Sequence, residues 1–375
     1  MWRSLSRAGR PTSARGSSAV LPPMMRMRSL AHWSLVAATA VFLAFPLTSG
    51  CKRNGKKGAA ASTWRAGPVA APDRASDAQA TWLGPAPSCR ELRATCGLSR
   101  DHDCCQSLRV PSGTFSRSYD GIDFLDPGAR ATTGDFYLDK YEVTVARFRA
   151  FVSAGMGTRA HPLAEGAGAH PRIAGSGWNA AWNAKLPADT AGLKAALRCH
   201  DAYASWTDRP GANENKPINC LDWYTGFAFC AWDGGRVPTE AEWNYAAAGG
   251  SEQRYYPWSV PSASTTIDDG YAVYCGGTCK LLDVGSKPRG DGRWGHSDLG
   301  GNVWEWTLDF AGGAYPMPCD DCADLRAGPY RAFRSGSNDD IAATLRSSVR
   351  HVYYPDYHGV VGIRCARSVE EQEKK

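Results

Sequence analysis

Several patterns that mark large functional classes are missing from this sequence. It has no basic face with interleaved aromatic residues, which argues against a nucleic-acid partner. It has no internal repeat and no regular alternation of strands with helices, which argues against solenoids and parallel α/β sheets. No G-x-S-x-G motif occurs, and "RSGSN" is typical of a turn, so a Ser-His-Asp hydrolase is not supported.

Length and charge set few further limits. The 375 residues, with 43% hydrophobic content, are enough for one large or two ordinary domains with a sizeable core. The formal net charge of +6 comes largely from Arg and Lys in the first 60 residues, so it says little about the folded part.

The first 50 residues have the features of an export signal. Arg26 and Arg28 precede an apolar run over residues 33–47, and small residues follow up to Cys51. The stretch from Leu47 to Cys51 resembles a bacterial lipobox, whose cysteine is diacylated and becomes the mature N-terminus. We therefore expect an exported, membrane-anchored lipoprotein of the cell envelope. An ordinary signal peptide or short membrane anchor, with Cys51 incidental, is the alternative.

Cysteine is plentiful, because the chain has thirteen and twelve of them lie beyond Cys51. An even number in an exported chain favours disulfides. Four crowd together and allow three connectivities: Cys89, Cys96, Cys104 and Cys105. Two more pairs are closely spaced: Cys275 with Cys279, and Cys319 with Cys322. Zinc held by these two pairs is the alternative, but an oxidising compartment favours local disulfides.

Composition divides the chain into five parts. Residues 1–50 are the signal region, residues 51–88 are a flexible tether rich in Ala, Pro, Gly and Ser, and residues 89–109 are Cys-rich. Residues 110–367 have one continuous globular pattern of short strands, turns and a few helices, which is typical of an α+β fold. Residues 368–375 form a charged tail.

The stretch "FYLDKYEVTVARFRAFVSAG" predicts a strand that leads into a helix. We expect the strand over residues 136–143, and a short helix that Thr144 caps and that ends near Gly155.

Two further helices have clear boundaries. One begins at Asp222, places Trp223, Phe227 and Cys230 on one stripe, and ends at the following glycine pair. The other begins with a capping box in "RVPTEAEWNYAAAGG", formed by the threonine and by the glutamate three residues after it.

Six motifs, taken in order, resemble the sulfatase-modifying-factor family, the relatives of formylglycine-generating enzyme. They are "FYLDKYEVTVARFRAFV", "GGRVPTEAEWNYAAAGG", "RYYPW", "DLGGNVWEW", "RAFRSGS" and "GIRCAR". The resemblance covers roughly residues 110–367. It implies a single α+β domain of irregular, C-type-lectin-like architecture, stabilised by disulfides and bound calcium.

The resemblance also implies a calcium site in "SDLGGNVWEW". Asp298 and Glu305 would supply carboxylates, and Gly301 and Val303 would supply backbone carbonyls, which are the oxygen ligands that calcium prefers. On an extended strand Glu305 points away from the two flanking tryptophans, so it can face an ion. The alternative is a buried carboxylate held by backbone N–H groups without an ion.

A second calcium site of the family is doubtful here. Its place near "IDDGYAVY" offers Asp268 and Asp269, but their spacing does not align cleanly. For disulfides, the resemblance implies a bond between Cys230 and Cys365. Cys199 and Cys220, which flank one loop, are a second expected pair.

The chain departs from the family where the catalytic cysteines belong. In formylglycine-generating enzymes two cysteines after the "RGGS" strand hold monovalent copper, whereas here residues 336–363 contain no cysteine. Asp339 and Asp340 lie near the expected position of the first, and carboxylates are poor ligands for monovalent copper. The H-x3-H-x-E motif of the iron-dependent branch is also missing. We therefore expect no copper.

The same C-terminal segment holds the remaining candidates for a ligand site. They are Asn338, Asp339, Asp340, Arg346, Arg350, His351 and His358. A cleft lined by these groups would suit an anionic or carbohydrate-like ligand, since Arg offers a planar fork of donors. The alternative is that these side chains make structural or surface pairs. His351 and His358 lack a second histidine at helical spacing, so a metal role is weakly supported.

Two functional hypotheses remain. The first is a non-catalytic module that displays a lectin-like face to a surface ligand or a protein partner. The second is an oxidoreductase of the same family with a rearranged metal site that uses Asp339, Asp340, His351 or His358. The missing cysteine pair favours the first.

Overall fold

The computed structural model describes residues 81–82 and 86–369. The expected signal region, Cys51, nearly all of the expected tether and the last six residues of the tail lie outside the described residues. Within the described ranges, no helix has both the length and the apolar character needed to cross a bilayer.

The strands form three small sheets. The first has the order β1-β2-β5-β10, with antiparallel neighbours throughout, and consists of β1 (Thr81–Trp82), β2 (Ser107–Val110), β5 (Phe136–Asp139) and β10 (Ala366–Ser368). The second pairs β3 (Gly113–Ser116) with β4 (Arg130–Thr133). The third has the order β8-β7-β6-β9 and consists of β6 (Trp304–Ala311), β7 (Tyr330–Arg334), β8 (His351–Tyr353) and β9 (Val361–Gly362).

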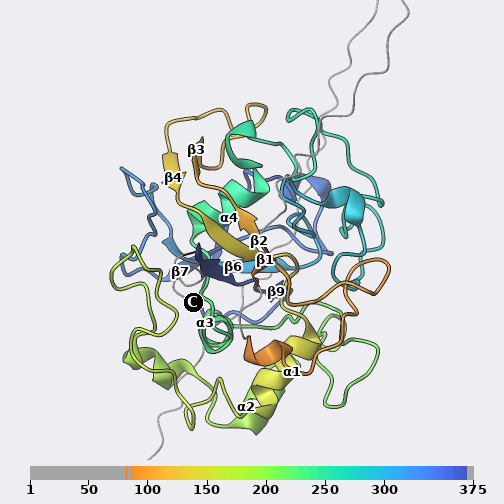
Figure 1. Cartoon of the computed structure of the whole chain (residues 1–375), viewed down its shortest axis with the longest axis vertical. Coiled ribbons are helices and arrows are strands. Elements are labelled where there is room, and N and C mark those ends of the chain that lie inside the picture. The colour runs from red at the N-terminus through yellow and green to blue at the C-terminus, as the bar shows by residue number, and fades with distance from the viewer. Residues whose placement is uncertain (1–80, 83–85, 370–375) are drawn as a thin grey trace, which may run out of the picture. The chain divides into compact units, whose positions relative to one another are not determined.

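Helices and long loops surround these sheets. The α-helices are α1 (Val145–Ser153), α2 (Thr190–Ala196), α3 (Trp223–Trp232) and α4 (Glu240–Ala247). Short 3-10 turns are η1 (Pro87–Cys89), η2 (Ala180–Lys185), η3 (Gly250–Glu252), η4 (Pro288–Gly290) and η5 (Ala342–Thr344). Figure 1 shows α1 and α2 at one end, β3 and β4 at the other, and β6 between them. This is an α+β fold with much irregular chain, as the sequence predicts.

The expected helix starts are present. The Thr144 side chain accepts a hydrogen bond from the Arg147 N–H, and Asp222 accepts one from Thr225. Thr239 and Glu242 form the expected capping box of α4. The strand expected over residues 136–143 is shorter, because β5 ends at Asp139.

That strand ends early because its continuation changes partners. β5 pairs with β2 and β10, whereas Val143 donates to the Ile363 carbonyl and accepts from Ile218. The chain therefore leaves the first sheet four residues sooner than the apolar pattern indicates.

The largest part of the core forms around α3, which is buried along nearly its whole length. Phe148 of α1 stacks on Phe229 of α3 with ring centres 5.3 Å apart. The Trp306 indole of β6 donates to the Leu221 carbonyl just before α3. These contacts hold the third sheet and α1 against α3.

Six disulfides join the twelve described cysteines. The pairs are Cys89–Cys105, Cys96–Cys104, Cys199–Cys220, Cys230–Cys365, Cys275–Cys279 and Cys319–Cys322. The first two select one of the three connectivities that the sequence allows for the Cys-rich segment, and the other four match the expected pairs. Cys230–Cys365 is fully buried and spans 135 residues.

A buried cluster of two arginines and two aspartates ties four distant segments together. Arg147 donates to Asp139 at 2.8 Å and to Asp233 at 2.7 Å, and Arg367 pairs with both aspartates. Ser88, directly before the Cys-rich segment, donates to Asp233 through its N–H. The two positive and two negative charges balance, so burial is tolerated as long as all four are present.

We expect the disulfides to contribute unequally to stability. Replacing both Cys230 and Cys365 by Ala should lower the free energy of unfolding by about 4–5 kcal/mol, because the long loop is no longer closed in the unfolded chain. The matched double variant of Cys275 and Cys279, which closes a loop of a few residues, should lose about 2 kcal/mol. Urea unfolding of the two variants measures both; equal losses would contradict the assigned pairing.

We also expect acid sensitivity at Asp139. Burial by itself would raise the pKa of this carboxyl, but the charges of Arg147 and Arg367 outweigh burial and lower it to about 2. Because the pKa of Asp139 is lower in the folded state, its ion pairs contribute their full stability above about pH 4. This contribution is lost as the pH falls toward 2. Over that window the wild type should lose about 2 kcal/mol more than the Asp139→Asn variant.

Urea unfolding from pH 5 to pH 2 measures this difference in slope. The control is Asp126→Asn, an exposed carboxylate that caps a turn through the Gly128 N–H. If the free energy of unfolding of Asp139→Asn falls with acid as steeply as that of the wild type, the buried arginine–aspartate cluster is wrongly assigned.

Candidate functional site

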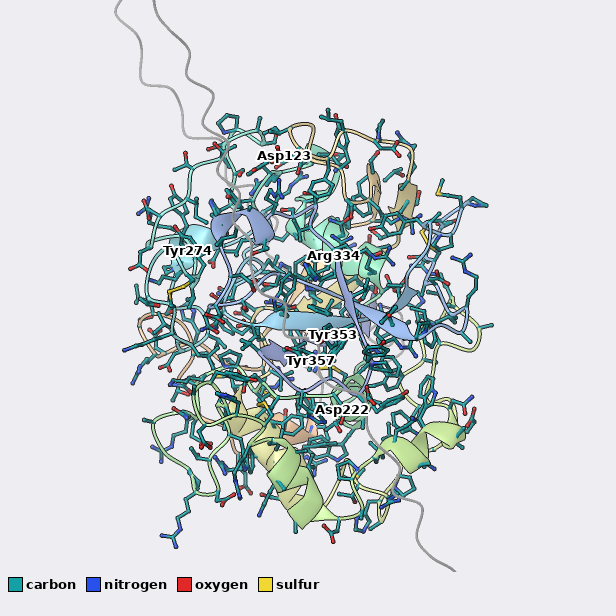
Figure 2. All side chains as sticks on the ribbon, turned by 180° about the vertical axis from the view of Figure 1, so that it is seen from behind. Asp123, Asp222, Tyr274, Arg334, Tyr353 and Tyr357 are labelled. Carbon is teal, nitrogen blue, oxygen red and sulfur yellow. A yellow bond between two sulfur atoms is a disulfide. The ribbon has the colours of Figure 1, made fainter. Side chains whose placement is uncertain are left out.

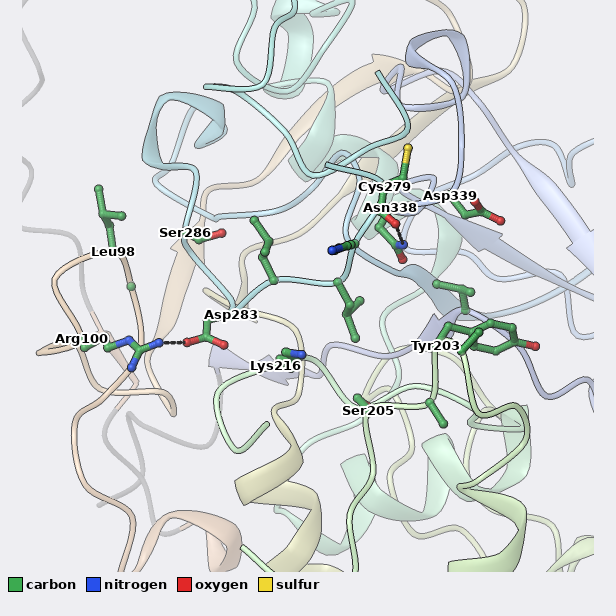
Figure 3. Close-up of a pocket in the computed structure, with 17 residues that line it drawn as sticks. Leu98, Arg100, Tyr203, Ser205, Lys216, Cys279, Asp283, Ser286, Asn338 and Asp339 are labelled. Atoms are coloured by element: carbon green, nitrogen blue, oxygen red, sulfur yellow. Dashed lines mark hydrogen bonds and ion pairs between the residues drawn. The ribbon is translucent and has the colours of Figure 1, made fainter. Parts of the chain in front are cut away.

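One groove stands out on the described surface, with a volume of about 870 Å³. Four loop segments that are far apart in sequence line it: residues 97–100, 202–205, 279–286 and 338–339. Figure 3 shows Asn338, Asp339 and Tyr203 toward one end and the Arg100–Asp283 ion pair toward the other.

Asn338 is the buried polar group of this groove. Its side chain is 5% exposed and donates to the Cys279 carbonyl at 3.3 Å, while its Oδ1 has no hydrogen-bond partner. Asp339 beside it is exposed and has no ion-pair partner among the described residues. Lys216 also lines the groove. The Asn338 oxygen is therefore a buried acceptor without a partner, which is costly.

The structure does not bring the seven candidate residues into one cleft. Asn338 and Asp339 line the groove, whereas Asp340 accepts hydrogen bonds from the N–H and hydroxyl of Ser337. Arg346 pairs with Asp123 and donates to the Ala343 carbonyl.

The other three candidates face different surroundings. Arg350 lies over the Tyr315 ring and near Glu240. His351 is exposed and packs against Trp304, and the His358 Nδ1 lies 2.8 Å from the Cys220 carbonyl oxygen. The seven candidates lie apart because the segment that carries them passes from a tight turn through η5 to β8. The single cleft expected from the sequence is therefore not formed.

No free thiol is present in the part of the chain that the structure describes, because all twelve of its cysteines form disulfides. Cys275–Cys279 lies at the groove and is the one described disulfide with both cysteines exposed. Over the same residues, no three His, Cys, Asp or Glu side chains converge closely enough to hold a metal by themselves.

Glu305 lies in β6 between Trp304 and Trp306, and it points away from them as the alternation predicts. Its carboxylate accepts hydrogen bonds from the Trp243 indole at 2.7 Å and from two nitrogens of Arg364 at 2.7 and 2.8 Å. Both tryptophan rings instead pack edge-on against Phe333. Glu305 is therefore a fully buried carboxylate with an arginine partner.

The loop before β6 curls tightly. Asp298, Gly301 and Asn302 all have positive φ angles of 58°, 103° and 61°. A Cβ on Gly301 would lie 2.5 Å from the Val273 carbonyl oxygen, so only glycine fits there. The Gly301 carbonyl accepts from the Ser335 hydroxyl, and Val303 is buried at the end of the loop.

Asp298 is a buried carboxylate that the loop holds beside other acids. Its Oδ2 accepts from the Gly285 N–H at 2.6 Å. Burial raises its pKa to about 6, and the neighbouring charges of Asp291 and Glu305 add to the rise. Burial therefore disfavours the charged form of this carboxyl, and the neighbouring acids disfavour it further.

Glu142 completes this carboxylate cluster, and the sequence reasoning missed it. Its Oε1 has no partner, its Oε2 lies 3.4 Å from the Asn302 amide, and burial followed by the charges of Asp298 and Glu305 raises its pKa. Three buried carboxylates face one arginine, so a cation would restore the charge balance. Glu142 in "DKYEVT" was the available signal, because a charged residue in a buried stretch rarely lacks a partner.

The weaker second calcium candidate has other partners. Asp268 lies 3.6 Å from Arg289, and Asp269 lies 3.3 Å from Lys287. Both aspartates are exposed, so neither belongs to a buried carboxylate cluster.

Comparison with known proteins agrees with this architecture. The chain is 29% identical over 337 residues to a formylglycine-generating enzyme of Streptomyces coelicolor, covering 80% of this chain and 97% of that protein. It is 28% identical to the enzyme of Mus musculus, of which it covers 57%. A hercynine oxygenase of Mycobacterium tuberculosis is 32% identical over 160 residues, covering 40% of this chain and 37% of that protein.

Among solved structures, PvdO from Pseudomonas aeruginosa has the same fold. It superposes with a TM-score of 0.51 at 22% identity, covering 71% of this chain and 95% of that protein. The family model of the sulfatase-modifying factor enzyme 1-like domain matches residues 95–369, which includes much of the Cys-rich segment. The chain therefore belongs to the sulfatase-modifying factor enzyme 1-like family.

Proposed function

We propose that this chain is a non-catalytic member of its family that binds a surface ligand or a protein partner. The observation that carries the proposal is the complete pairing of the described cysteines. A thiolate is the form of cysteine that binds soft metals and acts as a nucleophile, and a disulfide sulfur does neither. A scaffold that uses its sulfur for cross-links has no pair with which to hold monovalent copper.

The groove supports a binding role. It is large enough for a peptide-sized or sugar-sized ligand, and its buried Asn338 oxygen lacks a partner. Asp339 adds a charge that no described residue neutralises. Such groups fix the orientation of a ligand without needing to transfer electrons or protons.

The alternative of a rearranged oxidoreductase receives less support. His351 packs on Trp304, and His358 is held at the Cys220 carbonyl, so the two imidazoles do not share a site with Asp339. A redox metal needs several ligands around one point, and these side chains are directed elsewhere.

Calcium is the cation that the carboxylate cluster fits best. Asp298, Glu142 and the carbonyls of Gly301 and Val303 would supply the oxygen ligands, while Glu305 already has Arg364 as a partner. The ion would neutralise the excess negative charge and hold the left-handed loop before β6. Its role is structural.

The same proposal places the protein outside the cytoplasm. Six disulfides are typical of an oxidising compartment, and the export pattern before Cys51 fits it. A lipid on Cys51 would anchor the chain to the membrane through the tether. No nucleic-acid partner is expected.

Oxygen consumption tests the loss of catalysis. With a cysteine-containing sulfatase peptide and added copper, the protein should consume no oxygen above the rate of the peptide and copper alone. The formylglycine-generating enzyme of Streptomyces coelicolor serves as the positive control. Saturable, peptide-dependent turnover, or purified protein with stoichiometric copper, would overturn the proposal.

Thermal unfolding tests the calcium site. Calcium at about 100 times its dissociation constant should stabilise the fold by roughly 2.7 kcal/mol and so raise Tm by about 4–5 °C over the protein in chelator. Glu142→Gln and Asp298→Asn should each remove most of this rise, whereas exposed Asp268→Asn should keep it. An identical Tm with calcium and with chelator would rule the site out.

A further inference from the structure

Four tyrosines form an exposed row, and Figure 2 labels two of them, Tyr353 and Tyr357. Tyr353 and Tyr354 are 44% and 51% exposed, and Tyr330 and Tyr357 are half-buried beside them. The ring centres of Tyr353 and Tyr357 lie 4.1 Å apart, and those of Tyr330 and Tyr354 lie 4.8 Å apart. We call these four residues the tyrosine row.

The faces of these rings are not used by other described residues as cation sites. Elsewhere the chain covers tyrosine rings with its own arginines, as Arg289 does over Tyr271 at 4.1 Å and Arg350 over Tyr315 at 4.7 Å. No Arg or Lys of the described residues lies over a ring of the row. Exposed aromatic rings with free hydroxyls are typical of binding surfaces, because they offer large contact area at little entropic cost.

Negative charge lies along the row. The pKa of Tyr354 is raised first by its hydrogen bond with Tyr330, and Asp356 contributes to the rise. The pKa of Tyr357 is raised first by burial and then by neighbours that include Tyr203 and Asp340. Neither Asp340 nor Asp356 has an ion-pair partner in the described part of the chain. The surface therefore combines open ring faces with uncompensated carboxylates.

The row leads to the groove. Tyr203 and Val360 both line the groove, and Val360 follows Tyr357 of the row by only three residues. At the same end of the groove, the buried Asn338 Oδ1 lacks a donor and Asp339 lacks a cation. The exposed Asp339 therefore places an unpaired carboxylate at the end of the groove where Tyr203 lies.

We propose that the tyrosine row and the adjoining end of the groove bind an extended basic segment of a partner protein. Its arginine or lysine side chains lie over the rings of the row, with the exposed Asp356 beside the row and Asp339 in the groove as counter-charges. Lys216, farther along the groove, donates to a backbone carbonyl of the same segment. A row of several rings suits successive side chains of a chain better than one small cation. The inference rests on the proposed binding role.

Fluorescence anisotropy with two labelled peptides tests this surface on the full-length protein. The probe is a dodecapeptide of alternating Arg and Ser, and its matched control has Gln in place of each Arg. At physiological salt the Arg peptide should bind at least ten-fold more tightly than the Gln peptide. Asp356→Asn should weaken the Arg peptide and reduce the dependence of its binding on salt.

Variants of the row locate the site. Tyr353→Ala and Tyr354→Ala remove exposed rings, so the fold should be unaffected, and each should weaken the Arg peptide at least ten-fold. Phe124→Ala removes a comparably exposed ring outside the row, 39% exposed, and should bind as the wild type does. Unfolding temperatures within a degree of the wild type would show that the loss is local.

Several results would overturn the proposal. They are equal binding of the Arg and Gln peptides, unchanged binding by both tyrosine variants, and tighter binding of a chitin oligosaccharide or of phosphatidylcholine vesicles than of the Arg peptide. If the Arg peptide does not bind and the protein also consumes no oxygen, the peptide-binding surface is rejected and the proposed non-catalytic function stands. Peptide-dependent oxygen consumption would instead remove the non-catalytic function itself.

Discussion

The pairing of all twelve described cysteines is the constraint on which the rest of the structure depends. The Cys230–Cys365 bond joins α3 to the segment that enters β10, and the Arg147–Asp139–Arg367–Asp233 cluster crosses the same region. Two kinds of cross-link, one covalent and one ionic, therefore fix the first sheet to α1 and α3.

Charge balance explains the second feature of the fold. The Arg–Asp cluster is neutral and needs nothing further, whereas Glu142, Asp298 and Glu305 share only Arg364. With all three carboxylates ionised, this second cluster has an excess of two negative charges. The calcium ion that we propose at the curled loop before β6 would balance them, and it would stabilise the strand that carries Trp304 and Trp306 against the core.

Local features could be predicted from the sequence with good accuracy. Thr144, Asp222 and the capping box at Thr239 each start a helix where expected, because capping depends on neighbours a few residues away. The orientation of Glu305 followed from strand alternation in the same way. The domain's α+β class and family followed from ordered motifs.

Features that depend on contacts between distant segments could not be predicted from the sequence. The groove is built from four loop segments that lie between residues 97 and 339 of the sequence, so no local pattern marks it. The seven C-terminal candidates were expected to converge because they are close in sequence, yet the turn at Ser337 and the change to β8 disperse them. Glu142 was missed for the same reason: its partners lie about 160 residues away.

The claim that the scaffold has lost the thiol pair can be tested directly by alkylating the denatured, unreduced protein and mapping its peptides by mass spectrometry. The account predicts that no cysteine from Cys89 to Cys365 is alkylated until a reductant is added, and that the six pairs are recovered as linked peptides. Two cysteines in this range that are alkylated without reduction, in protein that also retains copper, would contradict it.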